Sequence, residues 1–226
     1  MRDDVSEEPV FQATRAPSAS DDAGVWGEPA LASASAADAA RDERRAWVAE
    51  QWETFGKGRR LKVFLGLCAI SGTMAVLCTL MKGSLGFASL AVIFGAPVVE
   101  EVSKALGPLM VLEKRPWCFG SFSSIVIVGL VSGLVFASIE NVLYFFVYIP
   151  SDKLTPGVVL WRLVACTAVH VAGAVLSCTG LARAWQRAAT TKGEFEMASA
   201  VPWFFAAMAL HAAYNFCAVV YSILVR

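Results

Sequence analysis

The sequence predicts an all-α integral membrane protein, a polytopic bundle of about five transmembrane helices preceded by a disordered tail and an interfacial helix. Of its 226 residues, 57% are hydrophobic and 17% are charged, which is too apolar for an ordinary soluble domain. Five apolar runs are each long enough to cross a bilayer. Charge is concentrated at the start, where residues 1–60 hold 12 acidic and 8 basic side chains. We therefore divide the chain into 1–45, 46–60 and 61–226.

Residues 1–45 form the predicted tail. This segment is rich in alanine, serine, aspartate and glutamate and has no sustained apolar period, a composition that cannot bury enough surface to fold alone. No apolar core of a signal peptide follows the first residues. We expect a disordered acidic tail that stays on the side of the membrane where it is made.

Residues 46–60 are predicted to form an amphipathic helix. Trp47, Val48, Trp52 and Phe55 recur at helical spacing, and a basic cluster follows them. Tryptophans suit the headgroup layer and basic side chains suit anionic lipid, so an interfacial helix is one interpretation. The alternative is a helix packed on the membrane body of the protein itself.

The predicted spans cover residues 61–226. They lie at about 61–81, 85–112, 119–149, 157–182 and 201–225. The third run is too long for one untilted span, so it is either one long helix or a span plus a shorter piece. Basic residues near the span ends favour a cytoplasmic N-terminus by nine to three. The nine expected inside are Lys57, Arg59, Arg60, Lys62, Lys114, Arg115, Arg183, Arg187 and Lys192, and the three expected outside are Lys82, Lys153 and Arg226.

Net charge and cysteine pattern exclude two classes of protein. Equal numbers of basic and acidic residues, 19 each, leave no basic excess for phosphate contacts, so we expect no nucleic-acid partner. The six cysteines show no C-x-x-C pair or regular spacing, which excludes a zinc finger and a disulfide scaffold. We interpret them as buried free thiols.

Ionisable and amide side chains inside the apolar runs mark the candidate site, because a charge at membrane depth costs about 2.5 to 3.5 kcal/mol even on lenient scales. They are Glu100, Glu101 and Lys104 in the second span, Glu140 and Asn141 in the third, His170 in the fourth, and His211 and Asn215 in the fifth. The only two histidines of the chain are both among them. Arg162 lies nearer a span end, and we expect it to reach the interface.

Helical spacing predicts how these groups pair, since residues four apart share a face. The three pairs are Glu100 with Lys104, Phe136 with Glu140, and His211 with Asn215. Neutralisation of Glu100 by Lys104 would leave Glu101 to face another helix. Pro97 and Pro108 predict a kinked helix around the two acids. Small residues such as Gly133 and Gly173 predict close packing of the third and fourth spans.

Three kinds of chemistry fit carboxylates, histidines and an amide that converge in lipid. A buried glutamate can activate water for hydrolysis while histidine or asparagine stabilises the oxyanion. Alternatively, two histidines and a carboxylate can hold zinc beside a glutamate base, although no H-E-x-x-H helix is present. Acids and histidines also line proton or ion pathways, but no repeated halves typical of transporters are found.

The ordered motifs resemble the PrsW family of intramembrane proteases. They are Glu100-Glu101-Val102-Ser103-Lys104, Phe136-Ala137-Ser138-Ile139-Glu140-Asn141 with Tyr144, then His170, and His211-Ala212-Ala213-Tyr214-Asn215. This family is similar to the larger superfamily of CAAX prenyl endopeptidases and bacteriocin-processing proteins. The motif set covers about residues 85–221 and uses both histidines.

The resemblance implies an intramembrane endopeptidase of the bacterial cytoplasmic membrane. Its catalytic residues would be Glu100, Glu101, His170, His211 and Glu140, supported by Lys104, Phe136, Asn141 and Asn215. The implied partner is a membrane-protein substrate, typically a single-span protein such as an anti-sigma factor. The chain departs from the superfamily in its few spans and its long acidic tail.

Catalytic type and activity remain open at the level of sequence. We favour a metal-free glutamic mechanism without a cofactor. The alternative is Zn²⁺ held by His170 and His211 with Glu101 or Glu140. A non-catalytic membrane scaffold of the same superfamily and an ion or small-molecule transporter are the alternative functions.

Overall fold

The computed structural model describes residues 29–83 and 91–224, and side chains within residues 36–72 and 93–221. The described residues form helices and contain no strand. The all-α prediction is confirmed. Residues 1–28, which make up most of the predicted tail, lie outside the described residues.

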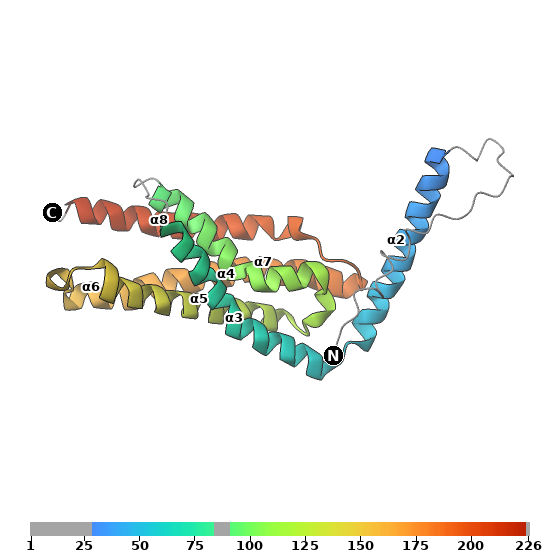
Figure 1. Ribbon diagram of the computed structural model, residues 1–226, viewed down its shortest axis with the longest axis horizontal. Coiled ribbons are helices and arrows are strands. Elements are labelled where there is room, and N and C mark those ends of the chain that lie inside the picture. Colours follow the sequence, from blue (N-terminus) through green and yellow to red (C-terminus); the bar gives the residue numbers. More distant parts are fainter. Residues whose placement is uncertain (1–28, 84–90, 225–226) are drawn as a thin grey trace.

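Helix α2 (Pro29–Thr54) and helix α3 (Lys57–Gly83) are separated by a short break. Figure 1 shows α2 leaning away from one end of the bundle. α2 spans the predicted boundary at residue 45, and the division of the chain into three domains stays a prediction. The aromatic face of α2 packs on the body of the protein itself, which was the alternative to an interfacial helix. The ring of Trp47 meets the ring of Trp117 edge-on at 5.2 Å between centroids, and Val48 is buried.

Helix α4 (Ala96–Lys114) carries the acidic pair. A π-helical turn, η2 (Ala91–Gly95), leads directly into it, and Pro97 lies in its first turn. Pro97 has no amide hydrogen to donate to a carbonyl of that preceding turn, so regular α-helical bonding is interrupted there. The irregular backbone therefore precedes Pro97, while Pro108 lies inside the helix.

Helix α5 (Phe122–Leu143) begins where the Ser121 hydroxyl accepts a hydrogen bond from the amide of Ser124, as expected of an N-cap serine. It continues without a break into a π-helical turn, η4 (Tyr144–Tyr148). The long apolar run at 119–149 is therefore one helix from Phe122 to Tyr148 rather than two.

The chain returns through helix α6 (Pro156–Trp161), the π-helical turn η6 (Arg162–Cys166) and helix α7 (Thr167–Thr191). Lys192 ends α7 in the left-handed conformation, with φ of 50°. Short 3₁₀ turns stand between helices at η3 (Pro116–Cys118), η5 (Ser151–Lys153) and η7 (Met197–Ser199). Helix α8 (Val201–Leu224) completes the bundle and runs back toward the end that holds α6 (Figure 1).

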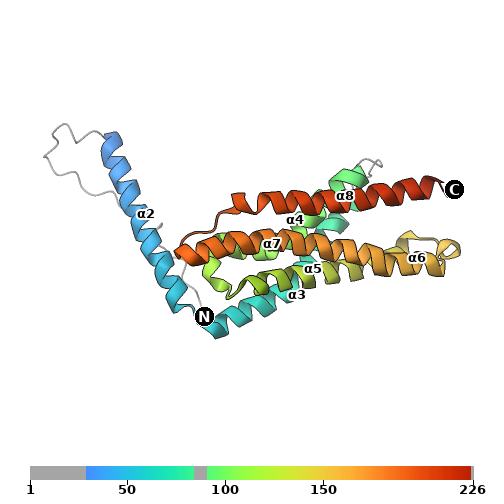
Figure 2. The ribbon, with the colours of Figure 1, turned by 180° about the vertical axis from the view of Figure 1, so that it is seen from behind.

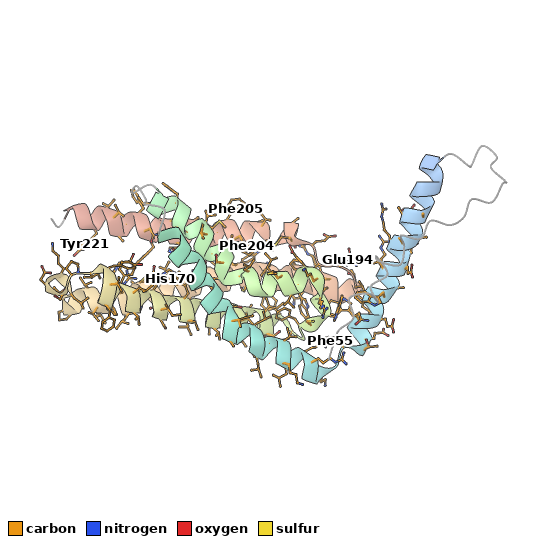
Figure 3. All side chains as sticks on the ribbon, in the orientation of Figure 1. Phe55, His170, Glu194, Phe204, Phe205 and Tyr221 are labelled. Atoms are coloured by element: carbon orange, nitrogen blue, oxygen red, sulfur yellow. The ribbon has the colours of Figure 1, made fainter. Side chains whose placement is uncertain are left out.

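The bundle is organised around α5 and α7, which pack on each other over most of their length. Figure 2, from behind, shows α8 beside α7 and α3 on the other side of α5. The apolar core lies toward the end where α7 finishes and includes Leu112, Phe119, Leu181 and Trp185. Helix α8 has a buried face and an exposed face: Phe204 is 5% exposed, whereas the neighbouring Phe205 is 67% exposed. Both side chains are labelled in Figure 3.

Three helical segments of the described residues are long and apolar enough to cross a membrane: Phe122–Tyr148, Pro156–Thr191 and Met197–Tyr221. They coincide with the third, fourth and fifth predicted spans. The first and second predicted spans overlap α3 and α4, and the total of five stays a prediction. The protein is an integral membrane protein built from a helical bundle.

Close packing of α5 on α7 predicts the effect of adding one methyl group. A Cβ at Gly133 would lie 2.8 Å from the Cα of Val171 and 2.9 Å from the carbonyl oxygen of His170. Overpacking against backbone costs about 1 to 3 kcal/mol, more than the roughly 1 kcal/mol that alanine gains over glycine in a helix. Gly133→Ala should therefore lower the midpoint of thermal unfolding in detergent micelles.

Gly66→Ala is the matched control, because no atom lies within 4 Å of a Cβ built at Gly66 on α3. This variant should unfold at the wild-type temperature or slightly above it. Equal midpoints for the two variants would contradict the close approach of α5 and α7.

Candidate active site

Glu100 and Glu101 on α4 are both buried, at 4% and 0% exposure. Glu101 Oε1 accepts hydrogen bonds from Lys104 Nζ at 2.5 Å and from His211 Nδ1 at 2.8 Å. Lys104 is also fully buried. The sequence predicts that Lys104 pairs with Glu100 four residues earlier, and this is wrong in detail: its ion pair is with Glu101, three residues earlier. Spacings of three and four both place side chains on one helical face.

The second carboxylate oxygen of Glu101 occupies a cradle made by Gly173. Glu101 Oε2 is buried and has no hydrogen-bond partner among the described residues. A Cβ built at Gly173 would lie 2.6 Å from this oxygen. Only a glycine leaves room for the carboxylate here, so the small residue on α7 serves the site as well as helix packing.

His211 on α8 joins the two glutamates. With its Nδ1–H donating to Glu101, its Nε2 faces Glu100, whose Oε2 lies 3.6 Å away. The His211 ring meets the His170 ring at 4.8 Å between centroids and 88° between planes. The two histidines predicted to share a site therefore do so.

His170 on α7 is 2% exposed and lies among the side chains shown in Figure 3. Its Nε2 is 2.9 Å from Glu140 Oε2 on α5, and its Nδ1 is 3.3 Å from Lys104 Nζ. A lysine ammonium can only donate, so Nδ1 accepts and Nε2 carries the proton toward Glu140. Phe136 packs on the ring of His170 at 4.8 Å and lies under Lys104 at 5.0 Å.

The supporting residues fall into two groups. Phe136 and Lys104 lie within the cluster, where Phe136 packs against His170 and lies under Lys104. Asn141 lies at its edge and donates to Thr167 Oγ1 at 3.2 Å. Asn215 is partly buried one helical turn after His211.

The donor atoms of Glu100, His170 and His211 all lie within 4.8 Å of one another, and all three residues are buried. Two imidazoles and a carboxylate are a donor set suited to a catalytic zinc ion, which uses three protein ligands and leaves a position open. The set therefore fits a divalent metal. Its carboxylate is Glu100, whereas the sequence predicts Glu101 or Glu140 as the third ligand. Glu140 belongs to a second set of possible metal ligands, together with Cys166 and His170.

Two further residues contribute to the cluster: Arg162, which the sequence predicts at the interface, and Cys166. Arg162 Nη2 donates to Glu140 Oε2 at 3.0 Å instead of reaching the interface. Cys166 Sγ lies 3.5 Å from the same oxygen. Both lie at four-residue steps before His170, a spacing that places side chains on one helical face.

This architecture defines an integral membrane bundle with a buried acid and histidine cluster. The family of PrsW intramembrane metalloproteases matches residues 54–225, and the chain belongs to that family. It is an intramembrane protease by family membership, as the motifs predict. No curated protein and no solved structure shows significant similarity to the chain.

The cradle at Gly173 predicts that one methyl group displaces the Glu101 carboxylate. Gly173→Ala should reduce proteolysis by at least about tenfold, because misplacement of a catalytic group by 1 Å can cost about 100-fold. The measurement is cleavage of a co-expressed membrane-protein substrate, normalised to folded enzyme. Gly66→Ala should cleave at the wild-type rate, and wild-type cleavage by Gly173→Ala would contradict the role of the cradle.

Proposed function

We propose that this chain hydrolyses a peptide bond of a membrane-protein substrate at the cluster of Glu100, Glu101, His170 and His211. The observation that carries the proposal is the convergence of Glu100, His170 and His211 within 4.8 Å in a buried part of the bundle. Isolated polar groups at membrane depth are costly. A cluster with complementary donors and acceptors is typical of a catalytic centre.

Glu101 is the residue we assign to proton transfer from water. Its Oε1 is held by Lys104 and His211, which fixes the carboxylate. Its Oε2 has no hydrogen-bond partner among the side chains and backbone that the structure describes, so we assign this oxygen to accept the proton. A general base needs a fixed carboxylate with one oxygen free to accept the proton, and Oε1 and Oε2 of Glu101 fulfil these two roles.

Glu100, His170 and His211 are the residues that would hold a divalent ion, with zinc the best match to the donor types. When bound in such a set, zinc lowers the pKa of its water to about 7 and polarises the substrate carbonyl. The Nδ1–H of His211 donates to Glu101, which leaves Nε2 as the ligating nitrogen. Carboxylates that orient a ligating imidazole in this way are common at metal sites.

Net charge also supports the metal-dependent assignment over the glutamic mechanism favoured from sequence. The cluster holds three acidic side chains, Glu100, Glu101 and Glu140, against the two basic side chains Lys104 and Arg162. Among these five side chains the acidic groups outnumber the basic groups by one, and an excess of acidic groups in an apolar bundle favours a bound cation. The Lys104 ammonium beside His170 favours the metal-free alternative, since it already supplies one positive charge there.

We propose a single-span membrane protein as the substrate, cut near the outer face of the membrane. Helix α5 begins at Phe122, and Glu140 lies eighteen residues later. This separation corresponds to about 27 Å along the helix axis. The cluster is therefore nearer to the end with α6 than to the end with η3. If the N-terminus is cytoplasmic, the α6 end is extracytoplasmic.

Two contacts support the proposal that the basic residues predicted to be cytoplasmic lie at the same end of the bundle. Arg60 donates to the carbonyl oxygen of Trp117 at 3.1 Å, and Lys192 forms an ion pair with Glu53. These contacts bring the starts of α3 and α5 and the end of α7 together, where most of the nine basic side chains lie. Their excess at one end matches the positive-inside rule.

Substitution of the catalytic groups tests the proposed hydrolysis. Glu101→Gln should abolish cleavage of a co-expressed single-span substrate, because the amide keeps the shape of the side chain but cannot take a proton from water. Glu100→Gln should also be severely impaired. Near-normal cleavage by both folded variants would favour a scaffold or another catalytic group.

Metal analysis of the same preparations tests the catalytic type. We expect about one zinc ion per active chain, lost in His211→Gln, with inhibition by a strong chelator and recovery on adding zinc. Full activity in metal-free, chelator-treated protein would overturn the metal assignment and restore the glutamic mechanism.

Cysteine labelling tests the orientation in a Cys217→Ser background. Asp152 in η5 and Thr191 at the end of α7 are both exposed. A membrane-impermeant maleimide should label Asp152→Cys in intact cells and Thr191→Cys only after the membrane is opened. The reverse pattern would place the N-terminus outside.

A further inference from the structure

Arg162 lies in the π-helical turn η6, between α6 and α7, and its side chain is 13% exposed. An arginine near a span end usually extends to the interface. Here the side chain points into the bundle, toward α5. A π-helical turn inserts an extra residue and is frequent at functional sites.

Three of the partners that hold the guanidinium of Arg162 lie on α5 and η4. Nη2 donates to Glu140 Oε2 at 3.0 Å, and Nε donates to Asn141 Oδ1 at 3.2 Å. The guanidinium also covers the ring of Tyr144, 3.4 Å from its centroid. A planar fork with several donors is suited to such a site, whereas a lysine ammonium would reach fewer partners.

Asn141 is itself fixed by bonds that return to the same turn. Its amide nitrogen donates to Thr167 Oγ1 at 3.2 Å, and it lies 3.5 Å from the carbonyl oxygen of Arg162. The arginine therefore meets a rigid acceptor rather than a mobile one. This network connects the end of α5 with the start of α7.

The same oxygen of Glu140 that accepts from Arg162 also accepts from His170 Nε2, at 2.9 Å. Arg162 fixes the position of that oxygen, and the oxygen fixes the imidazole. A carboxylate bound to one ring nitrogen selects the tautomer and the ring orientation. His170 then presents Nδ1 to the interior of the site, where Lys104 lies 3.3 Å away.

We propose that Arg162 is a positioning residue for His170 and acts through Glu140. The role of this arginine in catalysis rests on the proposed function, since His170 is taken there as part of the hydrolytic site. The guanidinium of Arg162 bonds to Glu140 and Asn141, so its effect on His170 is indirect. It sets which nitrogen of His170 faces the site, and it holds the ring against rotation.

Enzyme kinetics on the full chain give the first test. Arg162→Gln should lower kcat by about 10- to 100-fold, the usual cost of losing a group that orients an active-site ligand, with KM changed by less than about twofold. Arg162→Lys should recover part of the loss, because one donor can still reach Glu140. Arg183→Gln, on the exposed part of α7, is the matched control and should retain wild-type kcat.

A double-mutant cycle separates positioning from a structural role. If Arg162 acts through Glu140, then Arg162→Gln should cost less than about twofold in a Glu140→Gln background. Additive losses would overturn the proposal, and so would a fall in kcat that follows the folded fraction in thermal unfolding.

Nitrogen NMR of the two imidazoles provides a test that does not depend on activity. The chain has only two histidines, so ¹⁵N-histidine labelling gives two spin systems, which His211→Gln assigns. Wild-type His170 should show one protonated nitrogen, Nε2, and Arg162→Gln should shift the Nε2 resonance, because the Glu140 oxygen that accepts its hydrogen bond is no longer held. Arg183→Gln should leave it unchanged.

The two measurements distinguish the two hypotheses. An unchanged His170 spectrum in Arg162→Gln overturns the positioning role. A changed spectrum in protein that never cleaves any substrate supports the positioning of His170 by Arg162 and contradicts the proposed protease function.

Discussion

Burial of charge in an apolar bundle is the constraint on which the rest of the structure depends. Glu101 and Lys104 are fully buried and form an ion pair at 2.5 Å. An isolated charge at this depth would cost several kcal/mol, so each ionised group must find a partner. His211 bonds to Glu101 and His170 faces Lys104. The cluster is therefore both the candidate catalytic centre and the means by which its own charges are tolerated.

These polar contacts also hold the helices together. Apolar helices in lipid gain little from the hydrophobic effect on association, so close packing and hydrogen bonds decide their arrangement. Gly133 allows α5 to approach α7, and Gly173 allows the Glu101 carboxylate of α4 to approach α7. The same residues therefore determine both the geometry of the site and the packing of the helices. Substitutions at the site must be judged against the stability of the folded protein.

The two ends of the bundle are built differently. Where α7 ends, Trp185 packs in the apolar core and donates to the carbonyl oxygen of Pro116 at 2.8 Å. Toward α6, Arg162, Glu140 and Asn141 form a polar network beside the cluster. The apolar end provides rigidity because its contacts are dense and dry. The polar end sets the orientation of the groups that would react, and its geometry depends on a few directional bonds.

The sequence by itself determined the fold class and predicted most of the residues that the structure brings together in the cluster. Apolar runs of span length require helices in a membrane, and charges within them must converge, which identified Glu100, Glu101, Glu140 and both histidines. Spacing along one helix could not decide the partner of Lys104, because residues three and four positions away share its face. The neighbouring helices decided it: His211 from α8 and Gly173 from α7 enclose the carboxylate of Glu101.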